Sequence, residues 1–377
     1  MTLQQIEVPT SPAFLLDKNK IISSARILKQ LQDQCQCKVL YSIKSLPLTA
    51  VLQWLKPHVD GFSVSSLFEA RLANEILGDS GSLHLTSPGI NSDEFQELSQ
   101  LCQYISFNST HQFSRLAKNS SAQCSLGLRI NPGLSTLDDD RYDPCRVNSK
   151  LGVHVEQLIN LPLRDKIEGL HFHTSFSSRN FEPLKKVVNR LRAQLNDDLH
   201  TIKWINLGGG YLFDEIDDYQ EFVTLVKQLK QDFQLQVFIE PGKAIVGQAG
   251  FLLATVIDLF VSNGKKIVVL DTSVNHNPEV FEYQIQPELI NNDVDGNYVY
   301  ELVGSTCLAG DIFGEYRFKK PLLLGESVIF KNVGAYTLVK ASRFNGYNLP
   351  DIYALKGNQA TLLKHYSFQD YKSQWLG

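Results

Sequence analysis

The stretch "KVLYSIKSLP", residues 38–47, is an apolar run that ends in a charged side chain, Lys44, just before a turn. It is the first of eight short runs of this kind between residues 38 and 242. The runs are "KVLYSIK" (38–44), "GFSVSS" (61–66), "SLHLTS" (82–87), "YISFNS" (104–109), "CSLGLRIN" (124–131), "IEGLHFH" (167–173), "WINLGGG" (204–210) and "QVFIEPG" (236–242). Short apolar runs bounded by turn residues are typical of buried strands.

Most of the segments between these runs have the pattern of amphipathic helices. In "FEPLKKVVNRLRAQLN", for example, apolar side chains recur at helical spacing, at Leu184, Val187, Val188, Leu191 and Leu195. Strands that alternate with helices predict a parallel sheet. Eight such units over about 200 residues favour a closed (β/α)₈ barrel. The alternative is an open, doubly wound sheet. In that fold a G-x-G-x-x-G loop often follows the first strand, and no such loop follows the first run here.

After residue 243 the helical pattern becomes sparse, and β-branched and aromatic runs follow one another with turns between them. These runs are "FLLATVIDLFVS", "KKIVVLDTS", "NYVYELVGSTC" and "ESVIFKNVGAYTLV". They predict a second, mostly β domain, to which "SPAFLLDKNKI" near the start of the chain could add a strand. We therefore expect a barrel over residues 20–245 and a β domain formed by residues 1–19 and 246–377.

The composition is that of a globular protein with two domains. The chain has 377 residues, of which 43% are hydrophobic and 20% charged, and its net charge of −4 gives no reason to expect nucleic acid as a partner. No apolar run reaches the roughly 18 residues that span a bilayer, and the N-terminus does not read as a secretory signal. The six cysteines have neither zinc-site nor C-x-x-C spacing, so we expect reduced thiols, no metal and a cytoplasmic location.

In a barrel of this kind, residues at the C-terminal ends of the strands face the active site. The residues at these ends are Lys44, Ser63, Ser65, Arg129, His173, Gly208 to Gly210, Glu240 and Gly242. The lysine could be an ion-pair partner, a phosphate contact or an amine that condenses with an aldehyde. The glycine turn could cradle an oxyanion or be only a tight turn. The carboxylate could cap a helix or hold a proton on a heterocycle, and the histidine could be an ordinary core residue.

Taken together, these residue types fit pyridoxal phosphate better than any other cofactor. Lys44 would meet the aldehyde, and Glu240 would meet the ring nitrogen, whose protonation makes the ring an electron sink. The glycine turns would hold the phosphate, with Arg129 or Tyr336 as further candidates. His173 would supply a flat group over the ring.

The sequence resembles the fold-type III pyridoxal-phosphate decarboxylases, which combine an alanine-racemase-like barrel with a β domain. Within that group it is most similar to the carboxynorspermidine (carboxyspermidine) decarboxylases. The resemblance spans almost the whole chain, and its most specific stretches contain "CLAGD" and "FNG". It is carried by "YSIKS", "GFSVSSLFEA", "LRINPG", "YDPCRVNSKLGV", "GLHFHTS", "WINLGGGYL", "IEPGKAIVG", "LDTSVNHNPEVFEY", "GSTCLAGDIFGEY" and "GAYTLVKASRFNGYNLP".

The resemblance implies a role for each matching position in the barrel. Lys44 would form the aldimine with the cofactor, His173 would stack on its ring, and Glu240 would bond its nitrogen. Arg129 would lie beneath the cofactor. The phosphate would be held by Gly209, Gly210, Gly242 and Tyr336.

The resemblance also implies a homodimer whose subunits share their active sites. Cys307 and Asp311 would come from the second subunit. Cys307 would return a proton to the carbanion after CO₂ leaves, and Asp311 would contact the distal amines of the substrate. His276 and Glu279 would also lie at the substrate.

Three positions depart from the pattern of the carboxynorspermidine enzymes. Phe176 and serines follow "FHT" where a Cys-Glu pair is usual, Lys243 follows "EPG" where Glu is usual, and Glu279 stands where Asp is usual. Repulsion between Lys243 and a cationic substrate would weaken binding if the two were buried close together. These departures leave open a different substrate, such as ornithine, lysine, diaminopimelate or a specialised amino acid.

Two further classes of function remain as alternatives. A racemase needs bases on both faces of the ring and prefers a weaker partner than Glu240 at the ring nitrogen. A non-catalytic pyridoxal-phosphate carrier or regulatory homologue would lack the β domain or would be expected to lose Lys44 or Cys307. Both residues are present in this chain.

Overall fold

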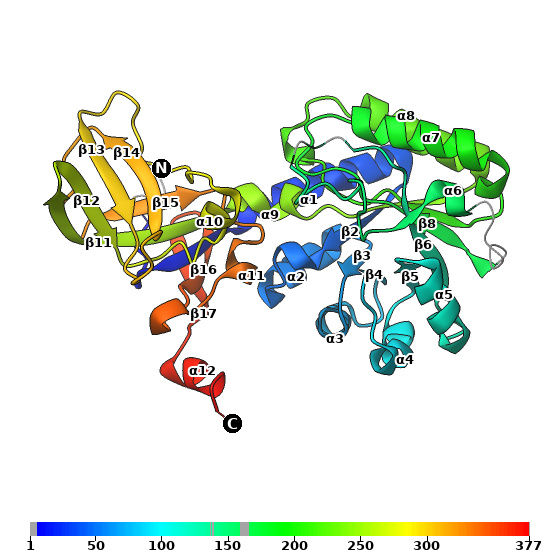
Figure 1. The fold of residues 1–377 in the computed structure, drawn as a ribbon, viewed down its shortest axis with the longest axis horizontal. Helices are drawn as coiled ribbons and strands as arrows, with labels where there is room; N and C mark the ends of the chain where they lie inside the picture. The colour runs from blue at the N-terminus through cyan, green and yellow to red at the C-terminus, as the bar shows by residue number, and fades with distance from the viewer. Residues whose placement is uncertain (1–5, 136, 138, 159–165, 377) are drawn as a thin grey trace. The chain divides into compact units, whose positions relative to one another are not determined.

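The computed structural model describes residues 6–135, 137, 139–158 and 166–376. The chain divides into two compact units (Figure 1). One unit spans residues 22–245, and the other combines residues 1–21 with residues 246–377. Residues 1–5 of the predicted β domain lie outside the described residues.

The first unit is a closed barrel of eight parallel strands, which confirms the predicted (β/α)₈ fold. The strands pair in the order β2-β3-β4-β5-β6-β8-β9-β10, and β10 pairs with β2 to complete the ring. Their bounds are β2 (Lys38–Ser42), β3 (Gly61–Val64), β4 (Ser82–Ser87), β5 (Tyr104–Phe107), β6 (Ser125–Asn131), β8 (Gly169–His171), β9 (Trp204–Asn206) and β10 (Gln236–Ile239). A two-residue strand, β7 (Val153–His154), pairs with β6 beside the ring.

The helices of this unit follow the strands and lie around the outside of the barrel (Figure 1). Their bounds are α1 (Lys18–Cys35), α2 (Thr49–Leu55), α3 (Leu67–Leu77), α4 (Ser92–Leu101), α5 (Thr110–Leu116), α6 (Val155–Leu158), α7 (Glu182–Leu199), α8 (Gln220–Phe233) and α9 (Lys243–Val246). Side-chain caps begin several of them; for example, the Ser66 hydroxyl accepts a hydrogen bond from the N–H of Glu69. Helix α8 buries one apolar face, which includes Phe222, Val226 and Leu229.

Aromatic side chains fill the barrel near the N-terminal ends of its strands. Trp204 and Tyr104 begin their strands, and the rings of Phe238 and His84 pack against them. Burial lowers the pKa of the His84 imidazole to about 3, so this histidine is neutral and packs as an aromatic ring. Gly169 is required here because a Cβ on it would lie 2.0 Å from the Trp204 indole. The packed floor leaves the C-terminal ends of the strands for a cavity.

The second unit is mostly β, as predicted. Its sheet has the order β14-β13-β12-β11-β1-β16-β17, and β15 pairs with β11. The strands are β1 (Ala13–Asp17), β11 (Gly250–Ser262), β12 (Lys265–Leu270), β13 (Tyr298–Val303), β14 (Ile312–Phe318), β15 (Ser327–Lys331), β16 (Asp351–Lys356) and β17 (Gln359–Lys364). The short helices are α10 (Glu279–Tyr283), α11 (Thr337–Lys340) and α12 (Phe368–Ser373). Strand β1 pairs antiparallel with β11 and parallel with β16.

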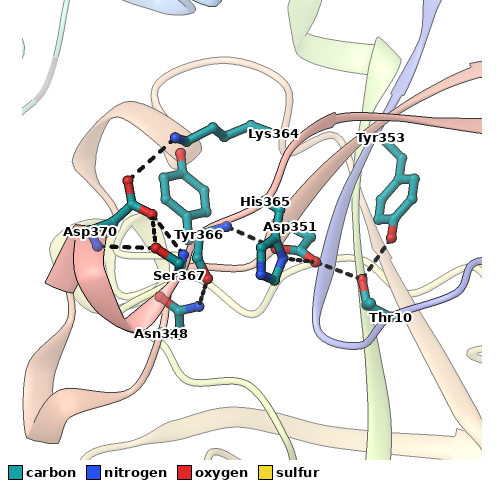
Figure 2. Close-up of polar contacts among 9 residues, drawn as sticks. All are labelled: Thr10, Asn348, Asp351, Tyr353, Lys364, His365, Tyr366, Ser367 and Asp370. Atoms are coloured by element: carbon teal, nitrogen blue, oxygen red, sulfur yellow. Dashed lines mark hydrogen bonds and ion pairs between the residues drawn. The ribbon is translucent and has the colours of Figure 1, made fainter.

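One buried carboxylate ties the two ends of the chain together in this unit (Figure 2). Asp351, which is 6% exposed, accepts a hydrogen bond from Thr10 and lies 3.0 Å from the Nδ1 of His365. It also accepts a hydrogen bond from the N–H of Tyr366, at 3.3 Å. Ser367 and Asp370 then form a reciprocal capping box that begins α12.

A search of the described helices finds none with the length and the apolar character needed to span a membrane.

Candidate active site

A cavity of about 480 Å³ opens within the barrel unit and collects most of the residues predicted from the strand ends. Lys44, Arg129, His173 and Glu240 all line it. Further lining residues are Ser63, Ser65, Thr86, Pro88, Asp140 to Pro144, Arg146, Ser149 to Leu151, His171, Ser175 and Phe176. One wall therefore holds an amine, a guanidinium, an imidazole and a carboxylate.

Three of these residues do not sit at the strand ends where the sequence placed them. Strand β2 ends at Ser42, and Lys44 lies in the 3₁₀ turn Ile43–Ser45 that follows it. His173 comes two residues after the end of β8, whereas Arg129 lies inside β6. The apolar runs continue past the last ladder hydrogen bond, so periodicity alone extends the strands too far. Glu240 follows directly after β10, as predicted.

The turn that carries Lys44 is fixed by several hydrogen bonds. The N–H of Ser42 donates to the carbonyl of Pro241 at 2.9 Å, which ties this turn to the "EPG" turn. The Ser45 hydroxyl donates to the Ser42 carbonyl at 2.7 Å. These bonds hold Lys44 and Glu240 on neighbouring strand termini.

Lys44 is accessible to solvent through the cavity, yet protein surrounds it on most sides. This burial lowers the pKa of its ammonium group, and the charge of Arg129 lowers it further. Glu240 and Glu69 act in the opposite direction. The net shift increases the neutral fraction of the amine, which is its nucleophilic form.

Glu240 is 5% exposed and is held by its neighbours. The side-chain amide of Asn206 donates to its Oε1 at 2.8 Å, and the Nε2 of His171 lies 3.6 Å from its Oε2. Burial alone would raise the pKa of this carboxyl, but His171, Lys44 and His173 together hold it well below its usual range. We attribute the ionised state mainly to Lys44 and the Asn206 bond, because burial lowers the pKa of both histidines and leaves them neutral.

His173 has a defined orientation in the cavity. The N–H of Gly209 donates to its Nδ1 at 3.1 Å, so the neutral ring carries its proton on Nε2. Burial, with the nearby charges of Lys44 and Arg129, lowers the pKa of this imidazole well below its usual value. A neutral, oriented ring of this kind is suited to stacking on a flat ligand.

The glycine turn after β9 can only be built from residues without side chains. Gly208 and Gly210 have φ values of +67° and +92°. A Cβ on Gly209 would lie 2.3 Å from the Glu240 carbonyl, and one on Gly210 would lie 1.9 Å from the Ser175 carbonyl. This close backbone packing beside Glu240 and His173, together with the cations of the cavity, fits a phosphorylated heterocycle. The N–H of Gly209, which the sequence assigned to the phosphate, is bonded to His173 in this structure.

Sequence reasoning missed residues that line the cavity or hold its lining residues in place. Asn206, which ends β9, accepts a hydrogen bond from the N–H of Gly208 and donates one to Glu240. A polar residue at the end of an apolar strand was the available signal. The "LDDDRYD" segment, interpreted only as a polar loop, places Tyr142 on the wall, where its ring stacks on Phe176 at 5.2 Å. Lys243 lies 5.9 Å from the Phe176 ring centroid and donates to Ser177.

The remaining predicted residues belong to the β unit. Cys307 is exposed, whereas Asp311 and His276 are buried. Tyr336 has a φ of +66° and precedes α11, and burial raises the pKa of its hydroxyl to about 12. Glu279 begins α10. The roles assigned to these residues stay predictions.

The fold and the cavity define the chain as a (β/α)₈-barrel enzyme with a lysine and a carboxylate set for a pyridoxal-type cofactor. Residues 19–247 match the family described as "Pyridoxal-dependent decarboxylase, pyridoxal binding domain". A Campylobacter jejuni carboxynorspermidine/carboxyspermidine decarboxylase is 31% identical over 96% of this chain and 97% of its own length. A Synechocystis carboxyaminopropylagmatine decarboxylase is 34% identical over 97% of this chain and 95% of its own length.

A solved structure supports the same conclusion. Carboxynorspermidine decarboxylase from Campylobacter jejuni, complexed with norspermidine, superposes with a TM-score of 0.89 at 30% identity, covering 97% of this chain and all of that one. The chain belongs to the pyridoxal-dependent decarboxylase family. It is a carboxy-lyase with pyridoxal phosphate as its cofactor.

Proposed function

We propose that this enzyme decarboxylates a carboxylated polyamine, carboxynorspermidine or carboxyspermidine, to the corresponding polyamine. The observation that carries the proposal is the cavity that holds Lys44, His173 and Glu240 together, in a chain whose full-length relatives act on substrates of this kind. Norspermidine, the triamine that decarboxylation of carboxynorspermidine would give, is also the ligand named for the superposed structure.

The residues of the cavity divide the work of binding and proton control. When bound, pyridoxal phosphate supplies an aldehyde that condenses with amines and a ring that withdraws electrons from the substrate α-carbon. Lys44 would present an amine of lowered pKa to that aldehyde. Glu240, kept ionised, would hold a proton on the ring nitrogen. His173, oriented by Gly209, would cover one face of the ring and exclude water from it.

The phosphate contacts and the proton donor complete the proposal. Gly210 and Gly242 would provide backbone contacts, and Gly209 would join them only by releasing its N–H from His173. Tyr336 would add a hydroxyl and Arg129 a charge near the ring. Cys307 would return a proton to the α-carbon once CO₂ has left. We propose that the enzyme is a homodimer and that the second copy supplies Cys307 to each barrel. The cytoplasmic location stays a prediction.

A second candidate substrate has a specific observation in its favour. Tyr142 and Phe176 stack in the cavity wall, and the Arg141 guanidinium lies 5.3 Å from the Tyr142 ring centroid. Planar guanidinium groups bind well to aromatic faces. A substrate ending in a guanidinium, such as carboxyaminopropylagmatine, could use the same pair, and the relative named for that substrate is 34% identical. Ornithine, lysine and diaminopimelate remain weaker alternatives.

A CO₂-release screen of the purified holoenzyme tests the proposal. The substrates are carboxynorspermidine, carboxyspermidine, carboxyaminopropylagmatine, ornithine, lysine and diaminopimelate, and the amine product is identified in each reaction. We expect the highest kcat/KM with a carboxylated polyamine. Release of CO₂ only from ornithine, lysine or diaminopimelate would reject the proposed substrate class.

A further inference from the structure

The carboxylate of Asp311 is buried in the β unit and already accepts hydrogen bonds from three donors. It is 3% exposed. Its Oδ1 accepts from the N–H of Val274 at 2.8 Å. Its Oδ2 accepts from the N–H of Thr306 at 3.1 Å and from the Thr306 hydroxyl at 2.5 Å. A carboxylate offers about four lone-pair sites, so little capacity remains for another donor.

The loop of residues 304–311, which we call the thiol loop, closes around this carboxylate and carries Cys307. The N–H of Gly304 donates to the Asp311 carbonyl at 2.8 Å, and the N–H of Asp311 donates to the Leu308 carbonyl at 2.9 Å. A Cβ on Gly304 would lie 2.2 Å from the Asp311 Oδ1, so the loop packs directly on the carboxylate. The position of the thiol therefore depends on Asp311.

A second segment holds the thiol loop from another side. The side-chain oxygen of Asn345 accepts from the N–H of Cys307 at 2.8 Å, and the Tyr347 hydroxyl donates to the Ser305 carbonyl at 2.7 Å. Asn345 has a φ of +56°, which asparagine tolerates better than most residues. The segment is anchored in turn, because the amide of Asn348 donates to the Tyr366 carbonyl at 2.5 Å (Figure 2).

We propose that Asp311 and Asn345 are positioning residues that set the place of the Cys307 thiol, and that Asp311 does not bind the distal amine of the substrate. The inference rests on the proposed function in one respect only, which is that Cys307 is the proton donor. A buried carboxylate committed to three donors holds a loop; a carboxylate that binds an ammonium must keep an accessible oxygen.

The position of the thiol decides which carbon receives the proton after CO₂ leaves. In the productive reaction the S–H bond breaks, its proton goes to the substrate α-carbon, and the amine is released. If the thiol is displaced, a proton from water goes to the aldehyde carbon of the cofactor instead. Water then cleaves the C=N bond, so the substrate carbon leaves as an aldehyde, oxidised by two electrons. The cofactor is reduced by the same two electrons to pyridoxamine phosphate.

The Asn345 variants form a matched pair. Asn345→Gly keeps the left-handed backbone and loses the acceptor, whereas Asn345→Asp keeps both. In cofactor-free protein we expect Asn345→Gly to speed amide hydrogen exchange at Cys307 by about two- to tenfold. This is the change expected when one exposed hydrogen bond is lost. It should also change the rate of Cys307 alkylation by iodoacetamide. Asn345→Asp should resemble the parent chain in hydrogen exchange at Cys307. The other five cysteines are buried, so alkylation reports on this thiol.

Asp311→Asn separates the two roles of the carboxylate. For a positioning residue we expect faster exchange at Thr306 and Val274, a larger fraction of aldehyde and pyridoxamine phosphate among the products, and a KM close to that of the parent enzyme. For a substrate ligand, KM would rise roughly tenfold to a hundredfold, because one charge-assisted hydrogen bond is lost, while exchange and product ratio stayed unchanged. That second pattern would overturn the inference.

A Cys307→Ala variant distinguishes failure of the inference from failure of the proposed function. If Cys307→Ala still yields only amine, the thiol is not the proton donor, and the positioning role falls with it. If Cys307→Ala yields aldehyde while both Asn345→Gly and Asp311→Asn match the parent enzyme in exchange, alkylation and products, the proposed function stands and the inference is wrong. If Asp311→Asn does not fold, the Asn345 pair still decides.

Discussion

The cavity of the barrel and the thiol loop of the β unit hold their polar groups in different ways. In the barrel, Lys44 and Glu240 follow strands of a closed sheet, and neighbouring charges and Asn206 fix their ionisation. In the thiol loop, Cys307 is exposed and its place depends on hydrogen bonds that Asp311 and Asn345 accept from loop N–H groups. A strand terminus is rigid because the whole ladder supports it, whereas a loop is only as rigid as its few anchors. Substitutions in the barrel should therefore abolish chemistry, and those in the loop should redirect it.

The largest effect is expected from Lys44→Ala. Among the described residues of the cavity wall, Lys44 is the only amine whose pKa is lowered. Its removal should reduce the rate of decarboxylation by at least about a thousandfold. The absorbance band of the bound Schiff base should disappear as well. Steady-state kinetics and an absorbance spectrum measure both. Lys150→Ala, which removes an exposed lysine from the same cavity, is the control and should keep the band.

Glu240→Gln should have the next largest effect. The substitution keeps the shape and the contact with Asn206 but removes the charge that would hold a proton on the ring nitrogen. The loss of one preorganised electrostatic contact corresponds to about 10²–10³ in kcat. Asp140→Asn, at an exposed position on the rim of the cavity, should change kcat by less than about threefold. Equal losses of kcat in the two variants would show that Glu240 has no specific role in the reaction.

Cofactor uptake should depend on pH through Lys44. Only the neutral amine reacts, so the rate of uptake by cofactor-free protein should rise about tenfold per pH unit until the pKa is reached. Because burial lowers that pKa, the rise should end below the value of about 10.4 for an exposed lysine. Glu240 raises the pKa of Lys44, so Glu240→Gln should shift the midpoint to lower pH.

The measurement for uptake is stopped-flow absorbance across a pH series, with a lysine-containing model peptide as the reference for titrations of the cofactor itself. A midpoint equal to that of the peptide would contradict a desolvated Lys44. A shift to higher pH in Glu240→Gln would contradict the proximity of the two groups.

The smallest expected effect is a partial recovery of activity on mixing two variants, one in the barrel and one in the thiol loop. If each active site takes Lys44 from one copy and Cys307 from the other, mixing Lys44→Ala with Cys307→Ala chains should restore activity. Half of randomly paired dimers are mixed, and each regains one of its two sites, so about a quarter of all sites recover. Activity of the mixture is compared with that of each variant alone. No recovery after verified subunit exchange would argue against shared sites.

The sequence predicted the barrel well because its eight strand runs are short, apolar and separated by amphipathic helices. It located Glu240, which follows directly after β10, and it extended β2 and β8 too far, because Ile43 and Phe172 are buried beyond the ladder. In the β unit, β14, β16 and β17 went unassigned: "IFGEYRF" and "QATLLK" mix polar and apolar residues without a clear boundary.

Residues of the candidate site were predictable where their chemical type is unusual for their position in the sequence. They were harder to predict where hydrogen-bond partners in the folded protein decide their role. Lys44 stood out as a charge that ends an apolar run. Asp311 was assigned to the substrate through a resemblance, and its three donors come from Thr306 and from Val274, which is remote in sequence. Tyr142 was missed because the wall of the cavity is built from a polar loop without any pattern of its own.

The central claim is that Lys44 is the amine that binds the cofactor, and borohydride reduction tests it most directly. The holoenzyme is reduced, digested and mapped by mass spectrometry, with Lys44→Ala treated in parallel. We predict one phosphopyridoxyl adduct, on the peptide that contains Lys44, and none in the variant. An adduct on a different lysine of the parent chain, or an unchanged adduct yield in Lys44→Ala, would contradict the account.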